Sequence, residues 1–492
     1  MRVAIVYPPF MRGRQYPQLG QNRQFRFSYS KAVRIYPIVP SIAATILHQA
    51  GHPTLYLDGM NLRLSREEFD SRLWDFRPEL IVMETKAPLI KEHWQFVTDV
   101  KARGEVLTAL CGDHVSFFPE ESLQCSPVDY CLTGGDYDVS LMGLVRHVSQ
   151  GQTLPGGIYY REGGEITNSG EYQPLQNLDD LPFIDRELTG WQTYSEAYLH
   201  HPCTYIMSGR GCGRSQDKAG VCTFCVWQHA LWRCSARLRS TRNVAEEIRD
   251  IVHRYQVKEI FDDNESGALW DKEWLRQFQR EMNREGLVGS VLLSTNARAD
   301  ALVDGELCQM LKDTGVRLVK VGLESGSDET LKRLNKKETV AEIKAGIRTA
   351  KDHGLAVLIT TMVGYPWETE EEVRQTYEVA RELMAYKTHL GDSLQSSVIV
   401  PYPGTPLYRQ AAKEGWLLYG LDEYEKYDMS GPVLKTEIDT ERWCQRMWQL
   451  HYAPRFLVGT VLSIRSLDDV KLLARGVWSL LGHVRDYDRS ER

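Results

Sequence analysis

The chain has 492 residues, a quarter of them charged, and a formal net charge of −7. This length predicts two to four domains with ample cores, and the weak negative charge gives no electrostatic basis for nucleic acid as a partner. No apolar run reaches about 18 residues, so we expect no transmembrane segment. The N-terminus is expected to be a strand and not a signal peptide, and ten cysteines in such a chain favour a reducing, cytoplasmic compartment.

Residues 1–150 alternate between apolar strands and helices, which predicts a parallel sheet. Strands are expected at 3–6, 54–57, 80–83, 106–111 and 128–132, with a helix from Ser41 to a stop at Gly51. Ligands of such sheets bind at the carboxyl ends of the strands. The candidate binding residues there are Tyr7, Pro8, Glu84, Gly112, His114, Gly134 and Gly135.

Residues 151–195 are rich in glycine, proline and acidic residues, which predicts a small hairpin and a linker. From residue 196 to about 415 strands and helices alternate again, and this pattern predicts a second α/β domain.

Three cysteines of the second domain, Cys212, Cys222 and Cys225, are the strongest chemical signal. Cys222 and Cys225 form a Cys-x-x-Cys pair, and nine residues separate Cys212 from Cys222. Four thiolates close a metal site, whereas three thiolates on a four-iron cluster leave one iron open to an outside ligand. The alternative is a zinc knuckle that also uses Cys234.

Polar residues and glycines end several predicted strands of the second domain, where the sites of parallel barrels lie. They are Asp262, Asp263, Asn296, Arg298, Glu324, Ser325 and Gly364. The two aspartates are equally suited to cap a helix that starts near Trp270, and Arg298 is equally suited to a structural ion pair.

Residues 416–492 are expected to form helices that close the mouth of this domain. Trp443, Met447, Leu450 and Tyr452 have amphipathic spacing, and 470–481 carries a second apolar face. The mixture of basic and apolar residues in 465–485 also suits a membrane-surface helix. Asp468, Asp469 and Asp486 disfavour that alternative, and 486–492 is expected to fray.

The second domain resembles the radical S-adenosylmethionine (SAM) family. The matching elements follow in family order: Ser208–Cys212 with Cys222-x-x-Cys225, 260–264, 293–298, Gly322-x-Glu324-Ser325-Gly326, 361–369 and 397–408. The resemblance implies a partial (β/α)₆ barrel at 196–415, a 4Fe-4S cluster bound by the three cysteines, and SAM on its open iron. The nine-residue spacer departs from the usual three, and a longer spacer can loop out without moving the ligands.

The same resemblance assigns roles to the strand-end residues. Asp262 and Asp263 would bind the SAM amino group, because an ammonium needs carboxylate or carbonyl acceptors. Asn296 and Arg298 would face the SAM carboxylate or the substrate. Glu324 and Ser325 would contact the ribose, and Gly364 would lie by the adenine.

The first domain resembles the flavodoxin-like, Rossmann-type cobalamin-binding domain of one radical SAM class. The matching pieces are Tyr7-Pro8-Pro9, Gly112-x-His114 and Gly134-Gly135-Asp136. The resemblance implies cobalamin at these strand ends. No histidine occurs between Pro8 and Leu47, so that loop would supply no histidine to the lower cobalt face. The alternative is a flavodoxin-like scaffold without a cofactor, with His114 as an ordinary surface residue of a turn.

Together these resemblances imply a cobalamin-dependent radical SAM methyltransferase that acts on an unactivated carbon of a small molecule and draws electrons from a flavodoxin or ferredoxin. The run from Trp227 to Arg233 is similar to members that act on polycyclic or isoprenoid substrates, although core packing is the stronger explanation. Three alternatives stay open: a cyclase or rearrangement enzyme with the same cofactors, a radical SAM protein without cobalamin that acts on tRNA, and a zinc-binding interaction module.

Overall fold

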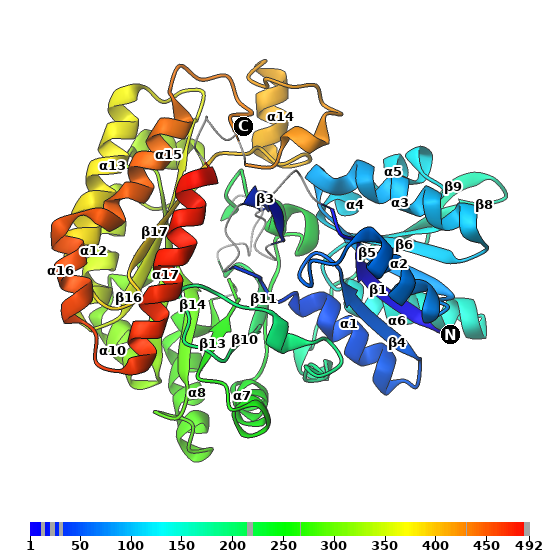
Figure 1. Ribbon diagram of the computed structural model, residues 1–492, viewed down its shortest axis with the longest axis horizontal. Helices are drawn as coiled ribbons and strands as arrows, with labels where there is room; N and C mark the ends of the chain where they lie inside the picture. Colours follow the sequence, from blue (N-terminus) through cyan, green and yellow to red (C-terminus); the bar gives the residue numbers. More distant parts are fainter. Residues whose placement is uncertain are drawn as a thin grey trace.

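The computed structural model describes residues 1–10, 15–19, 25–28, 33–213, 220–265, 267–429 and 431–486. Two α/β domains lie side by side, the first on the right of Figure 1 and the second on the left. The predicted α/β fold is confirmed. Three stretches of the segment after the first strand (11–14, 20–24 and 29–32), most of the Cys212–Cys222 spacer and the last six residues lie outside the described residues.

The first sheet has five parallel strands followed by an antiparallel hairpin. Its order is β4 (Thr54–Asp58), β1 (Val3–Tyr7), β5 (Leu80–Thr85), β6 (Leu107–Gly112), β7 (Tyr130–Leu132), β8 (Ile158–Glu162) and β9 (Glu165–Asn168). The parallel part has the flavodoxin-like order, with its topological switch point between β1 and β5. The hairpin expected in the 151–195 segment exists, and it extends this sheet.

Alternating side chains of these strands pack against helices on the two faces of the sheet. Val3, Ile5, Leu80 and Val82 belong to the cluster that contains α1 and α6, whereas Ala4, Val6, Ile81 and Met83 pack with α2, α3 and α5. The helices are α1 (Ile38–Gln49), α2 (Arg66–Asp75), α3 (Ile90–Arg103), α4 (Asp113–Phe117), α5 (Pro119–Cys125) and α6 (Tyr137–Gln150). Helix α1 begins three residues before the predicted start at Ser41.

The second sheet is an open half-barrel of parallel strands in sequence order. They are β10 (Cys203–Ile206), β13 (Glu259–Asp262), β14 (Leu292–Ala297), β15 (Val316–Glu324), β16 (Ala356–Val363) and β17 (Ser393–Val398). The partial barrel of six strands is therefore confirmed, although its last strand ends at Val398 and not at the expected Tyr402. Its helices are α7 (Thr241–Tyr255), α8 (Lys272–Arg284), α9 (Ala299–Leu302), α10 (Gly305–Asp313), α11 (Asp328–Arg333), α12 (Val340–Asp352), α13 (Glu370–Ala385) and α14 (Pro406–Lys413).

The C-terminal helices α15 (Thr440–Trp448), α16 (Pro454–Leu462) and α17 (Leu467–Asp486) follow the barrel. Helix α15 packs against β17, and α17 is tied to the start of β10 by Arg475, whose guanidinium donates to the Leu199 carbonyl at 2.7 Å. The expectation of helix throughout 416–492 was wrong for 416–439, where the described residues form a short 3-10 helix at Tyr424–Lys426 and a β-bridge between Leu417 and Leu434. The predicted second apolar face of the tail is also not buried: Val470, Val477 and Leu481 are about half exposed.

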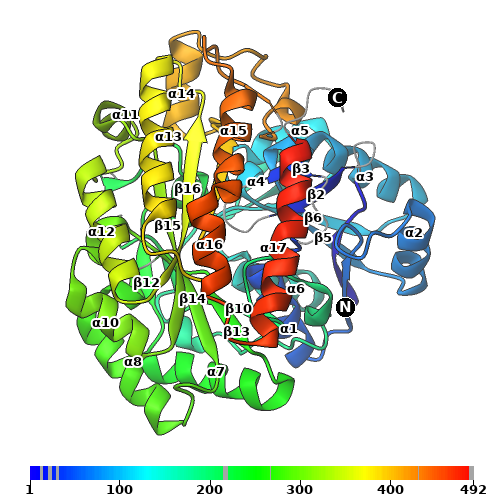
Figure 2. The same cartoon turned by 60° about the vertical axis from the view of Figure 1, so that its left-hand side comes forward.

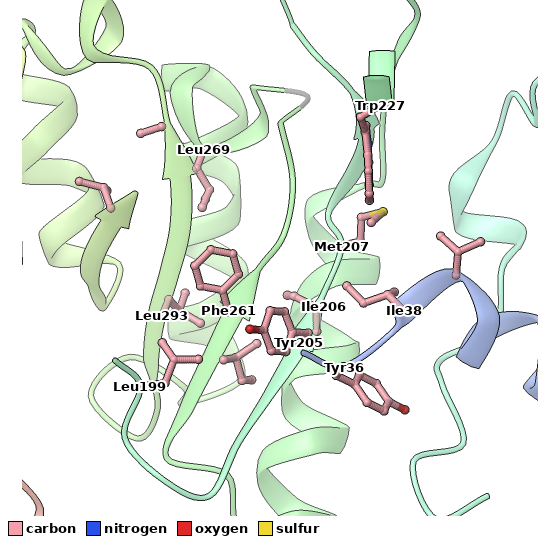
Figure 3. Packing of buried hydrophobic residues seen from close by; sticks show 14 of the residues in the cluster. Tyr36, Ile38, Leu199, Tyr205, Ile206, Met207, Trp227, Phe261, Leu269 and Leu293 are labelled. Atoms are coloured by element: carbon pink, nitrogen blue, oxygen red, sulfur yellow. The ribbon is translucent and has the colours of Figure 1, made fainter. Parts of the chain in front are cut away.

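A single hydrophobic cluster runs from the first domain into the second. Figure 3 shows Ile38 of α1 beside Ile206 and Met207 at the end of β10, with Phe261 and Leu293 of the next two strands on the other side of Ile206. This continuity fixes the two domains against each other by apolar burial.

Buried ion pairs cross the same boundary. Arg210 precedes the first cysteine of the motif by two residues, and its guanidinium lies 2.5 Å from both Asp136 and Asp138 of the first domain. Arg237, in the strand β12 (Ala236–Leu238) that pairs with β11 (Gly209–Gly211), binds Asp136 at 2.7 Å. Burial alone would raise the pKa of Asp136, but Arg210 and Arg237 hold it well below its ordinary value.

Replacing Asp138 by asparagine tests how strongly this boundary depends on its charges. Asp138 is fully buried, so Asp138→Asn leaves Arg210 partly uncompensated and is expected to cost about 3 to 5 kcal/mol of unfolding free energy. Urea unfolding followed by circular dichroism measures the loss. Glu246→Gln, which breaks the pair with the exposed Arg242, is the matched control and should unfold near the wild-type urea concentration. Equal midpoints for Asp138→Asn and the control would contradict the prediction.

Candidate active site

A cavity of about 260 Å³ lies at the carboxyl ends of the second sheet. Cys212, Cys222 and Cys225 line it together with residues from four strands and their ends: Asn296, Arg298, Lys320, Glu324, Thr361 and Gln395. Trp448 of α15 and His483 of α17 line it as well, and their rings stack with centroids 4.7 Å apart. The C-terminal helices therefore form a wall of the cavity, as the sequence predicted.

The backbone around the cysteines is held on three sides. Gly211 has a φ of +95° and lies so close to the Ser235 carbonyl that a side chain would not fit, which explains the glycine before Cys212. The Thr223 amide donates to the Leu334 carbonyl at 3.0 Å, and the Leu407 amide donates to the Thr223 carbonyl at 3.0 Å. The loop is therefore fixed by α11 and α14, whatever the length of the spacer at 214–219, which lies outside the described residues.

The three thiols share one electrostatic environment. Burial raises the pKa of Cys222 to about 11, and Cys225 and Cys212 add to the shift, whereas Lys336 and Arg298 oppose it. Cysteine thiolates need nearby positive charge, which bound iron would supply and to which Lys336 and Arg298 contribute. Cys234 of the zinc alternative does not line the cavity, and its thiol contacts the Gln228 carbonyl at 3.9 Å.

The cysteine arrangement suits a cluster better than a single ion. Among the described residues, no three His, Cys, Asp or Glu side chains converge as the ligands of one ion do. Three thiolates that bind three different irons of one cluster need not converge on a point. The three cysteines that line one cavity therefore fit a four-iron cluster.

Charged groups beside the cysteines form a buried network. The ammonium of Lys336 lies 3.6 Å from Glu324 and 3.4 Å from Glu338, and Arg298 lies 3.3 Å from Glu338. Burial disfavours the charge on Lys336, yet the two glutamates raise its pKa, so it stays a cation. Glu324 has a φ of +61°, which is strained for a residue with a side chain. The network places a carboxylate, an ammonium and a guanidinium at the edge of the cavity.

The other four residues proposed for SAM do not line the cavity. Asp262 accepts hydrogen bonds from the amide and hydroxyl of Ser208 at 2.9 and 2.6 Å, and so fixes the lead-in to the cysteine loop. Asp263 accepts from the Asn296 side chain at 3.0 Å. The helix-cap alternative is wrong for both, because Asp271 caps α8. Ser325 donates to Glu368 at 2.6 Å, and Gly364 packs closely against Thr440 of α15.

Predicted cobalamin residues of the first domain are placed at its strand ends but are covered. Tyr7 and Tyr137 donate to Glu84 at 2.6 and 2.9 Å in a buried cluster, and Pro8 follows directly on Tyr7. Gly134 lies against the ring of Tyr172 and Gly135 against that of Trp232, so side chains of this chain fill the space that the glycines leave.

The remaining two candidates are also enclosed. Gly112 has a φ of +101° and packs on the backbone of Thr85. The alternative in which His114 is a surface residue of a turn was wrong: it lies in α4, 2% exposed, with its ring 4.7 Å from that of Tyr424.

Two buried polar groups nevertheless fit a bound group in the first domain. Both ring nitrogens of His93, on the first turn of α3, lack a hydrogen-bond partner among the described residues, although the side chain is only 1% exposed. One carboxylate oxygen of Asp113 is similarly unpartnered. His93 and Asp113 follow β5 and β6, at the end of the sheet where ligands bind. Val33 and Ile35, in the segment after β1, line the cavity that contains the three cysteines.

The sequence did not single out several residues of the cavity. Glu196 and Lys320 line it, as does Gln228, whose buried amide has no partner among the described residues. Thr361, also lining the cavity, has an unpartnered hydroxyl. A lone polar residue in a linker or an apolar run carries no sequence signal, because its orientation is decided by tertiary packing. Unpartnered buried amides and hydroxyls are costly, so these groups fit a cavity that is meant to hold a ligand.

Comparisons with known proteins agree with this geometry. Residues 206–380 match the model of the radical SAM superfamily, so the chain carries a radical SAM domain. An uncharacterised methyltransferase of Pyrococcus horikoshii is 25% identical over 84% of this chain and 86% of its own length. The anaerobic magnesium-protoporphyrin IX monomethyl ester cyclase of Rubrivivax gelatinosus is 23% identical over 78% of this chain and 66% of its own length.

The whole fold is shared with a solved structure. The radical SAM methyltransferase TsrM of Kitasatospora setae, with cobalamin and a [4Fe-4S] cluster bound, superimposes with a TM-score of 0.68 at 15% identity, over 97% of this chain and 98% of that one. Both domains, their order and the C-terminal helices are therefore shared with the fold of TsrM.

Glu196 gives a pH-dependent test of the cavity. Burial raises its pKa from an ordinary 4.5 to about 7, although Tyr205 donates to it at 2.6 Å. The folded protein thus binds the proton of Glu196 more tightly than the unfolded chain does. The contribution of this proton to the unfolding free energy is complete below about pH 4.5 and is lost as the pH rises to about 7. Relative to Glu196→Gln, the wild type should lose about 3 kcal/mol across this range. Urea unfolding of both proteins at pH 5, 6, 7 and 8 measures the difference. If the unfolding free energies of the wild type and Glu196→Gln changed with pH in parallel, the raised pKa of Glu196 would be refuted.

Proposed function

We propose that this chain, whose residues 206–380 form a radical SAM domain, is a cobalamin-dependent radical SAM methyltransferase that methylates an unactivated carbon of a small molecule. The observation that carries the proposal is the single cavity in which three cysteines, a buried ion-pair network and unpartnered polar groups meet at the carboxyl ends of the half-barrel. The shared fold with TsrM and the similarity to a named methyltransferase support it.

The cysteines and their neighbours would hold the reactive groups. Cys212, Cys222 and Cys225 would each bind one iron, and Lys336 with Arg298 would offset the negative charge of the thiolates. When bound, the cluster and SAM supply a radical that abstracts hydrogen, and cobalamin supplies the methyl group. Electrons would come from a flavodoxin or ferredoxin.

The polar residues of the cavity would orient SAM and substrate. Glu324 presents a carboxylate that suits a ribose diol, and the guanidinium of Arg298 suits a carboxylate, while Asn296 lines the cavity with its amide held by Asp263. Four residues would act indirectly, by fixing the residues that line the cavity and the cysteine loop: Asp262, Asp263, Ser325 and Gly364. Gln228 and Thr361 offer unpartnered groups to the substrate or to SAM.

The first domain would hold cobalamin at the carboxyl ends of its strands. His93 and Asp113 provide polar atoms without partners there, and Tyr7, Pro8, Glu84, Gly112 and His114 surround the same strand ends. Gly134 and Gly135 would support it only indirectly, because Tyr172 and Trp232 cover them.

A second candidate function is ring closure with the same cofactors. The similarity to the magnesium-protoporphyrin ester cyclase over 78% of this chain favours it. In the cyclase case SAM would be cleaved to 5′-deoxyadenosine, but no methyl group would reach the product.

Single cysteine variants test the cluster. After anaerobic reconstitution the wild type should hold about four irons and four sulfides. Cys212→Ala, Cys222→Ala and Cys225→Ala should each lose most of both and should no longer form 5′-deoxyadenosine, because each removes one of only three ligands. Cys234→Ala is the matched control, since this cysteine lies outside the cavity, and should keep iron, sulfide and activity. Normal SAM cleavage by Cys225→Ala would overturn the cluster assignment.

A labelling experiment separates the two functions. Reconstituted protein is incubated without oxygen with hydroxocobalamin, a strong reductant, trideuteromethyl-SAM and a small-molecule extract, and the products are examined by mass spectrometry. A methyltransferase should form 5′-deoxyadenosine, S-adenosylhomocysteine and a product that carries the labelled methyl group. Deoxyadenosine alone, with an unlabelled product, would favour the cyclase. Formation of neither nucleoside would contradict both.

A further inference from the structure

The C-terminal helices expose an unusual number of large apolar side chains. Of the sixteen that are strongly exposed among the described residues, ten lie between residues 452 and 481. We call these ten the apolar face: Tyr452, Leu457, Val458, Val461, Leu462, Leu467, Val470, Val477, Trp478 and Leu481. A stretch of thirty residues thus holds most of the exposed large apolar groups in the part of the chain that the structure describes, and such concentrations mark interaction sites.

The apolar face follows the helix periodicity of α17. Its five exposed apolar residues lie on one side of the helix, because their spacing follows the helical repeat: Leu467, Val470, Val477, Trp478 and Leu481. Leu467 and Trp478 are the most exposed of them, at 81% and 65%. The opposite side, with Leu472, Leu480 and His483, is buried. Helix α17 is therefore apolar on two sides, and only one of them is used by the fold. Figure 2 shows α16 and α17 on the same outer side of the second domain.

The acidic residues of this segment are all paired; two of them are largely buried, whereas the side chain of Asp468 is 38% exposed. Asp468 lies 2.5 Å from Lys258, Asp469 lies 3.1 Å from His200, and Asp486, 4% exposed, accepts from Ser28 at 2.6 Å. These are the three acids that in the sequence disfavoured a membrane-surface helix. Because Asp469 and Asp486 face the protein and Lys258 offsets the charge of Asp468, these acids add little repulsion towards an anionic surface that approaches from outside.

The cations of the segment lie on the outside. Arg455, Arg465, Lys471 and Arg485 are exposed around the apolar face. From 452 to 486 there are five Lys or Arg and three Asp, a net charge of +2 in a chain whose net charge is −7. Exposed leucine, valine and tryptophan edged by lysine and arginine is the composition of helices that lie in the headgroup region of anionic bilayers.

We propose that α16 and α17 dock the protein onto the surface of an anionic lipid bilayer. The helices would lie in the interface, with the apolar face in the acyl boundary and the four cations on lipid headgroups. Among the described residues no helix is long and apolar enough to cross a bilayer, which is consistent with surface attachment. Since His483 of α17 lines the cavity, the docked helix would separate the active site from the lipid by the thickness of one helix. The proposal stands whether or not the proposed chemistry is correct.

Vesicle flotation tests the proposal on the full chain. The wild type is mixed with vesicles of phosphatidylcholine and phosphatidylglycerol (3:1) and with pure phosphatidylcholine vesicles. It should float with the anionic vesicles at least about tenfold more than with the neutral ones, and 0.5 M salt should reduce the floating fraction. Trp478→Ser with Leu481→Ser should reduce flotation about tenfold. Leu418→Ser with Leu421→Ser, which alters exposed apolar residues elsewhere, should not.

Three results would overturn the proposal. The first is no flotation of the wild type on either vesicle. The second is equal loss in the two double variants, which would mean general stickiness. The third is a concentration-dependent dimer in analytical ultracentrifugation, without flotation, that the double variant Trp478→Ser with Leu481→Ser abolishes. In that case the apolar face would bind a second copy of the chain and not a bilayer. Both double variants should unfold near the wild-type urea concentration, because the altered side chains are exposed.

Discussion

The buried charges between Asp136 and Arg210 are the constraint on which the arrangement of the site depends. Arg210 is 2% exposed and lies two residues before Cys212, while Asp136 directly follows Gly134 and Gly135. Desolvating these ions is costly unless they stay paired, so the ends of the first sheet fix the strand that leads into the cysteine loop. Trp232 fills the remaining space, between Gly135 and the guanidinium of Arg210. The two glycines therefore serve contact between the domains.

The same junction determines what the cavity is made of. With the domains joined by one hydrophobic cluster, the half-barrel opens towards the segment after β1, and Val33 and Ile35 complete its lining. The C-terminal helices supply another wall through Trp448 and His483. Three separate parts of the chain thus enclose one small volume, in which Glu324, Lys336 and Arg298 compensate one another while polar groups such as Gln228 remain available to a ligand.

Periodicity and spacing predicted the scaffold well and the site unevenly. Buried parallel strands are continuous apolar runs, so β1, β5, β6 and the half-barrel strands could be predicted from the sequence, and strand ends located Asn296, Arg298 and Glu324 at the cavity. Asp262 and Ser325 have the same sequence signal but face Ser208 and Glu368, because orientation at a strand end depends on a neighbour that is distant in sequence. Lys336 and Glu196 reach the cavity from a turn and a linker, where no periodic pattern marks them.

Helix α17 shows why an apolar pattern does not specify its partner. Its sequence repeats apolar residues at helical spacing, which predicts a helix but not which surface buries them. The structure buries Leu472 and Leu480 and leaves Leu467 and Trp478 in solvent. The ion pairs agree with this burial: Asp468 and Asp469 pair with Lys258 and His200 and so favour the same rotation of the helix about its axis. That rotation turns His483 towards the cavity and Trp478 away from the protein, so a single orientation of the helix both lines the site and exposes the apolar face.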